Sequence, residues 1–136
     1  MTYAGDLSPQ QAWEALETDP RAVLVDVRTQ AEWAFVGVPD LTALGKRVIP
    51  IEWSTFPQGR PNDAFLTQLG HHVEQDAPVY FLCRSGARSV SAADAATAAG
   101  WGAAHNILDG FEGPVDDHGH RAIAGWKHAG LPWRQG

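Results

Sequence analysis

Short apolar segments recur along the chain and are separated by polar, turn-forming residues. They predict strands at residues 22–27, 48–51, 79–82 and 105–108. The first and third of these segments show no apolar-polar alternation, which is typical of strands that are covered on both faces. Pro50 cannot donate a hydrogen bond to a neighbouring strand, so we expect the second strand to be short or near a sheet edge.

Helix signals lie between the strands. Ser8 before Pro9, with a glutamine at the third helical position, is a capping pattern, and Thr29 and Glu32 have capping-box spacing. An alanine-rich stretch ends at Gly100, which is typical of a helix stop. The expected helices run from Pro9 to about Glu17, from Thr29 to near Gly37, from Asn62 to Val73, from Ser91 to Ala99, and from about Arg121 to His128.

The alternation of strands and helices predicts an α/β fold in which crossover helices join parallel strands. With 136 residues, 44% of them hydrophobic, we expect residues 1–136 to form one domain that folds without metal or disulfide. A formal net charge of −6 argues against a broad nucleic-acid-binding face. Neither a membrane span nor a signal peptide is recognisable, so we expect a cytoplasmic protein with no membrane partner.

The single cysteine, Cys83, follows a predicted buried strand and precedes a helix, which is where open α/β sheets bind ligands. The next residues include Gly86, small side chains, Arg84 and Arg88. Backbone N–H groups of such a loop can surround an anion, and cationic neighbours with a helix N-terminus favour a thiolate. The alternative is that Cys83 serves only as a small apolar side chain at the end of a strand. The uninterrupted run of features favours a reactive cysteine.

These motifs resemble the rhodanese family of single-domain sulfurtransferases. The matching segments are Leu24–Arg28 followed by Glu32-Trp33, the loop Cys83–Ser89, and Gly125-Trp126 with Ala129–Trp133. The resemblance implies a three-layer sandwich whose central parallel sheet has five strands and is flanked by helices. It also implies that a cysteine takes a sulfane sulfur from a donor such as thiosulfate, holds it as a persulfide, and passes it to a thiol or other nucleophilic acceptor.

The family resemblance assigns roles residue by residue. Cys83 matches the persulfide-forming cysteine, and neither cofactor nor metal is expected. Arg84 and Arg88 match the anion contacts. The substrate-binding loop would comprise Arg84, Ser85, Gly86, Ala87, Arg88 and Ser89. Because the chain has no second cysteine, the sulfur must leave to an external small-molecule or protein acceptor. The sequence identifies neither this acceptor nor the donor, and it leaves the oligomeric state open.

Two segments depart from the usual family pattern. Residues 37–47 replace a shorter family motif, which affects the wall of the site and therefore acceptor choice. An insert at Gly113–Arg121 would lie near the mouth of the site and could form a partner-binding rim. Within it, Asp116–His120 contains metal-ligand residue types, but a polar surface loop explains this segment better.

Two other functional classes compete with sulfur transfer. Cysteine-dependent phosphatases generally have five residues between cysteine and arginine, whereas four separate Cys83 from Arg88. The shorter loop favours a single sulfur atom over a phosphoryl group, whose three oxygens must be bound. A non-catalytic binding module is the other alternative. Asp26 and Arg28 could face the crevice, but an ion pair or turn cap explains them at least as well.

Overall fold

The computed structural model describes residues 3–55, 59–84, 86–114 and 124–135. Its central sheet has five parallel strands in the order β1-β6-β5-β2-β4. These strands are β1 (Gly5–Leu7), β2 (Val23–Asp26), β4 (Ile49–Pro50), β5 (Val79–Leu82) and β6 (Ala104–Ile107). The described structure therefore confirms the predicted α/β fold with a five-stranded parallel sheet.

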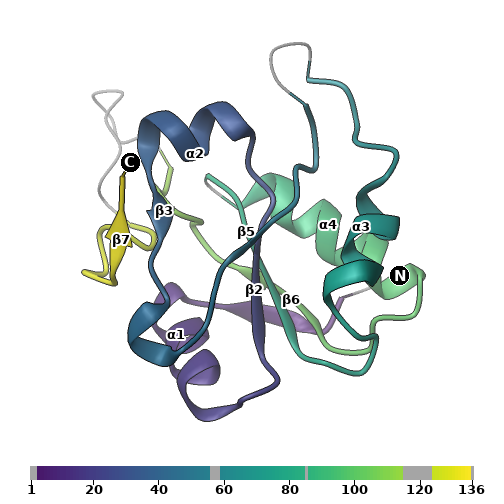
Figure 1. Ribbon diagram of the computed structural model, residues 1–136, viewed down its shortest axis with the longest axis horizontal. Helices are drawn as coiled ribbons and strands as arrows, with labels where there is room; N and C mark the ends of the chain where they lie inside the picture. Colours follow the sequence, from purple (N-terminus) through teal and green to yellow (C-terminus); the bar gives the residue numbers. More distant parts are fainter. Residues whose placement is uncertain (1–2, 56–58, 85, 115–123, 136) are drawn as a thin grey trace.

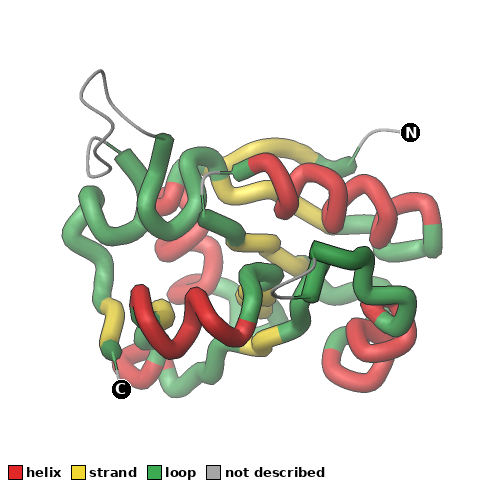
Figure 2. Tube along the Cα trace, turned by 90° about the horizontal axis from the view of Figure 1, so that it is seen from above, coloured by secondary structure: helices red, strands yellow, loops and turns green. Residues whose placement is uncertain are grey.

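Helices cover both faces of this sheet (Figures 1 and 2). The helices are α1 (Pro9–Thr18), α2 (Gln30–Val36), α3 (Phe65–His72) and α4 (Ala87–Ala98), with a short 3-10 helix, η1, at Thr42–Leu44. One apolar core joins α3 and α4 to the sheet through residues such as Phe65, Phe81 and Ala92. A second core on the opposite face includes Leu16 of α1, together with Trp126 from the C-terminal segment. The sheet is thus the middle layer of three.

The capping signals and the edge strand are found where the sequence predicts them. Ser8 accepts a hydrogen bond from Gln11 N–H at 3.1 Å, and the Gln11 side chain accepts one from Ser8 N–H at 2.9 Å. Thr29 and Glu32 form the same box at the start of α2. Strand β4, which contains Pro50, lies at the edge of the sheet and pairs with β2.

Several boundaries differ from the predictions. Helix α3 begins at Phe65 because the Asn62 side chain accepts the N–H of Ala64 in a turn before the helix. Helix α4 begins at Ala87 rather than Ser91, so the loop after β5 is shorter than expected. Strand β6 starts one residue earlier than predicted.

Three short strands lie outside the segments that the apolar pattern predicts. Strand β1 is short and partly exposed, and β3 (Val38–Pro39) pairs antiparallel with β7 (Trp133–Arg134). Residues 124–128 of the expected final helix form bends and turns, while residues 121–123 lie outside the described residues. No helix in the described ranges is long and apolar enough to cross a membrane.

Candidate active site

Cys83 lies directly after β5, at the carboxyl edge of the sheet, and is 1% exposed. The N–H of Gly86 donates to Cys83 Sγ at 3.1 Å, and Ser89 Oγ lies 3.2 Å from the same sulfur. Gly86 is also the N-terminal cap of α4. The sulfur therefore faces a backbone donor and the positive end of a twelve-residue helix, which favour negative charge in front of it.

Gly86 makes this turn possible. Its φ of 112° lies in the region that side-chain-bearing residues rarely adopt, and this conformation turns its N–H back towards the sulfur. Ala87 is exposed, whereas Ser89 is buried in the first turn of α4. Ser85, the remaining small residue of the predicted loop, lies outside the described residues.

The two arginines of the loop are both paired with carboxylates. Arg88 donates to the two oxygens of Glu32 at 2.7 and 3.0 Å, and Arg84 Nε lies 2.9 Å from Oε1 of Glu112. A donor anion would have to compete with these carboxylates for either guanidinium. Contact between the arginines and a donor anion therefore stays a prediction.

The Arg88–Glu32 pair joins the cysteine loop to α2. Burial raises the pKa of Glu32, but hydrogen bonds from Arg88 and Thr29 and the charge of Arg88 outweigh it and hold that pKa below its ordinary value. The hydrogen bond to Glu32 in turn raises the pKa of Arg88. Both groups are therefore charged at neutral pH, and the pair fixes the first turn of α4 against α2.

The segment that follows β6 fixes the other side of the cysteine loop. Phe111 N–H donates to the carbonyl of Cys83 at 2.8 Å, and Glu112 N–H donates to that of Arg84 at 3.0 Å. Gly110 has a φ of 59°, and a Cβ added there would overlap the Cys83 carbonyl oxygen. A glycine at this position allows the two backbones to approach closely.

Asp26 and Arg28 form a buried ion pair. Arg28 Nη2 lies 2.6 Å from Asp26 Oδ2, and both side chains are at most 1% exposed. Arg28 also donates to the carbonyl of Gly37 at 2.8 Å and lies 4.3 Å above the ring of Phe111. This agrees with the interpretation of the two residues as an ion pair that fixes the loops around β2.

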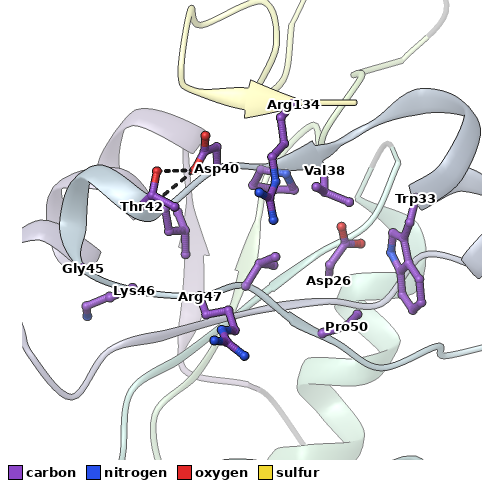
Figure 3. A pocket seen from close by; sticks show the side chains of 13 residues that line it. Asp26, Trp33, Val38, Asp40, Thr42, Gly45, Lys46, Arg47, Pro50 and Arg134 are labelled. Atoms are coloured by element: carbon purple, nitrogen blue, oxygen red, sulfur yellow. Dashed lines mark hydrogen bonds between the residues drawn. The ribbon is translucent and has the colours of Figure 1, made fainter. Parts of the chain in front are cut away.

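The segment 37–47 lines a cavity of about 870 Å³ (Figure 3). Asp26 and Trp33 lie on one side of it, and Arg134 extends from β7 above it. Cys83 does not line this cavity. Since side chains two positions apart share a sheet face, Asp26 points to the α1 face with Leu24, whereas Cys83 belongs to the core on the α3 and α4 face. The departure from the family pattern thus shapes a different part of the molecule from the cysteine loop.

Sequence reasoning missed three polar residues that contact the loop. Glu32 was explained by its capping box, which concealed its pairing with Arg88. Glu112 carried no local signal. Asn106 Oδ1 lies 2.5 Å from Ser89 Oγ, and Asn106 is buried. The sequence signal for it is a polar residue inside a predicted strand, because a buried polar side chain needs a hydrogen-bond partner.

His71 and His72 are exposed in the last turn of α3. Asp116–His120, and most of the insert Gly113–Arg121, lie outside the described residues. Among the residues with described positions, no three metal-ligating side chains come together.

Comparisons with known proteins match nearly the whole chain. A family model described as STR4 middle domain matches residues 4–136. An uncharacterized protein of Rickettsia conorii is 40% identical over 124 residues, which cover 91% of this chain and 92% of that protein. A sulfurtransferase of Allochromatium vinosum is 33% identical over 110 residues, covering 81% and 76% of the two chains.

A longer relative and a solved structure also match this chain. Rhodanese-like domain-containing protein 4 of Arabidopsis thaliana is 30% identical over 93% of this chain, which covers 25% of that protein. The crystal structure of Rv0390 from M. tuberculosis has a TM-score of 0.93 and 58% identity, and the match covers 99% of this chain and 100% of that one. With its cysteine loop at the carboxyl edge of a five-stranded parallel sheet, the chain belongs to the rhodanese-like family.

Proposed function

We propose that this protein is a sulfurtransferase that carries a sulfane sulfur as a persulfide on Cys83. The donor would be a small anion such as thiosulfate, and the acceptor a thiol or another nucleophile. The observation that carries the proposal is the contact of Gly86 N–H with Cys83 Sγ at the start of α4. The sulfurtransferase of A. vinosum, at 33% identity, supports the same class of reaction.

The reaction would proceed in two displacements at sulfur. The Cys83 thiolate attacks the outer sulfur of thiosulfate, a new S–S bond forms, and the old S–S bond breaks with its electron pair leaving on sulfite. The acceptor thiolate then attacks the outer sulfur of the persulfide, and Cys83 leaves as a thiolate. The proton of the resting thiol passes to solvent before the first step. No electrons are gained or lost overall.

The described geometry suits a loop that holds one additional sulfur atom. Backbone donors that are fixed before the reaction stabilise charge without reorganising, and Gly86 N–H is fixed by the turn into α4. Both arginines of the loop are paired, so backbone donors and the helix terminus are the groups immediately available to a charged sulfur. No cofactor is part of this mechanism.

The test compares sulfur transfer with phosphate release. Wild type and Cys83→Ser are assayed side by side for transfer from thiosulfate to cyanide and for hydrolysis of an aryl phosphate. We expect transfer by the wild type alone and no phosphate release by either protein. Cysteine-dependent phosphate release would favour the phosphatase alternative. A folded wild type that transfers no sulfur from any tested donor would favour a binding module.

A further inference from the structure

A chain of hydrogen bonds connects the buried sulfur to the surface. Ser89 Oγ, in the first turn of α4, lies 3.2 Å from Cys83 Sγ and 2.5 Å from Asn106 Oδ1 on β6. Asn106 Nδ2 donates to Asp6 Oδ1 on β1 at 3.0 Å. Ser89 and Asn106 are buried, whereas Asp6 is exposed. The first turn of α4 and the strands β6 and β1 thus contribute one polar chain to the cysteine.

Asp6 determines the direction of every bond in this chain. An ionised carboxylate can only accept, so the Asn106 amide must turn its NH₂ group to Asp6 and its carbonyl oxygen to Ser89. Tyr3 also donates to Asp6 Oδ1, at 2.7 Å, and this hydrogen bond raises the pKa of Tyr3 to about 12. The tyrosine therefore remains a donor, and Asp6 remains an acceptor on both sides.

The orientation of Asn106 determines where the proton of the Ser89 hydroxyl points. A serine hydroxyl has a single proton, and at 2.5 Å an acceptor oxygen would repel the hydroxyl unless that proton lay between them. The carbonyl of Gly86 lies farther from Ser89 Oγ, at 3.1 Å. Because the Ser89 hydroxyl donates its proton to Asn106, it can only accept a hydrogen bond from Cys83. Ser89 therefore binds a thiol S–H and opposes a thiolate.

We propose that Asp6 and Asn106 are positioning residues that direct the Ser89 proton away from Cys83. This deepens the proposed function and rests on it. The arrangement favours the thiol, whose S–H can donate to Ser89, and it opposes the persulfide less than the thiolate because the charge of a persulfide lies on its outer sulfur. It disfavours the Cys83 thiolate that carries no transferred sulfur. This hydrogen-bond chain thereby lowers the reactivity of the sulfur-free site towards electrophiles and shifts the balance towards the sulfur-loaded form once a donor has reacted.

The other charged groups around these residues must be kept unchanged in a test. Arg88 with Glu32 and Arg84 with Glu112 lie next to the cysteine loop. At the exposed end of this hydrogen-bond chain, Tyr3 interacts with both Asp6 and Asp94 of α4. A substitution at Asp6 leaves all of these residues in place.

The test is the pH profile of Cys83 alkylation by iodoacetamide in wild type and Asp6→Asn. Asparagine has the same shape but accepts or donates, so it permits Asn106 to turn over and Ser89 to donate to sulfur. We expect the profile to move to lower pH and the rate at pH 7 to rise about tenfold, the effect of one hydrogen bond gained by a charged group. An unchanged profile would overturn the proposal.

Two further variants separate hydrogen-bond direction from the loss of a charge. Asp94→Asn removes the same charge from the same region but leaves the carboxylate that holds Asn106, so we expect a profile close to wild type. In a Ser89→Ala background, Asp6→Asn should have no effect. A persistent shift there would show direct charge repulsion and contradict the proposal. Alkylation needs no sulfur donor, so failure of the proposed sulfur transfer would be seen separately in the transferase assay.

Discussion

Replacing Glu32 by glutamine tests how the cysteine loop is held against α2. Glutamine suits the capping-box position, so Thr29 keeps its partner, and the substitution removes the negative charge that faces Arg88. The two bonds are 2.7 and 3.0 Å long, and the Arg88 and Glu32 side chains are only 28% and 19% exposed. Charge-assisted bonds in such a site contribute more than neutral ones, so we expect a loss of about 2 kcal/mol in the free energy of unfolding.

The assay is urea unfolding followed by tryptophan fluorescence. For a denaturant slope of about 2 kcal/mol per molar, the midpoint should fall by about 1 M at an unchanged slope. Asp76→Asn provides the matched control, since Asp76 lies 2.7 Å from Arg21 but both side chains are at least half exposed. We expect a smaller shift for Asp76→Asn. Equal shifts in the two variants would refute the idea that partial burial strengthens the Arg88–Glu32 pair.

Three other outcomes follow from the same contacts. Asp26→Asn leaves the buried Arg28 guanidinium without its counter-charge. Thermal and urea unfolding should therefore show a free energy of unfolding that is lower by about 3–5 kcal/mol. Gly110→Ala places a methyl group against the carbonyl of Cys83, so it should lower both stability and sulfur-transfer rate, and a rate equal to wild type would contradict this. Because the pKa of Glu32 is lowered by folding, its contribution to stability is present above its ordinary value of 4.5 and is lost as the pH falls below it. The free energies of unfolding of wild type and Glu32→Gln should therefore become equal in acid.

The sequence was informative where local chemistry decides the structure. The capping boxes at Ser8 and Thr29, the buried strand before Cys83 and the edge position of Pro50 all depend on neighbours within a few residues, and the structure confirms them. Strand β1 was missed because three partly exposed residues give no apolar period, and only pairing with β6 makes them a strand. Local signals also placed the start of α4 too late, because Gly86 rather than a polar side chain caps it.

The contacts around the cysteine loop required the tertiary structure. Glu32 and Arg88 are 56 positions apart, and Asp6 and Asn106 are 100 apart, so no spacing rule relates them. The sequence predicts anion contacts for both arginines of the loop but gives no sign of the carboxylate that the fold places beside each of them. The Gly86 N–H and the N-terminus of α4 face the sulfur directly, whereas each arginine is paired with a carboxylate.

The central claim is that Cys83 carries the transferred sulfur as a persulfide, and intact-protein mass spectrometry tests it most directly. Wild type and Cys83→Ser are treated with thiosulfate, freed of excess donor, measured, and measured again after addition of a thiol acceptor. The account predicts that wild type gains the mass of one sulfur atom, that the peptide containing Cys83 carries it, and that the acceptor removes it. A folded wild type that gains no sulfur, or a Cys83→Ser protein that gains one, would contradict the account.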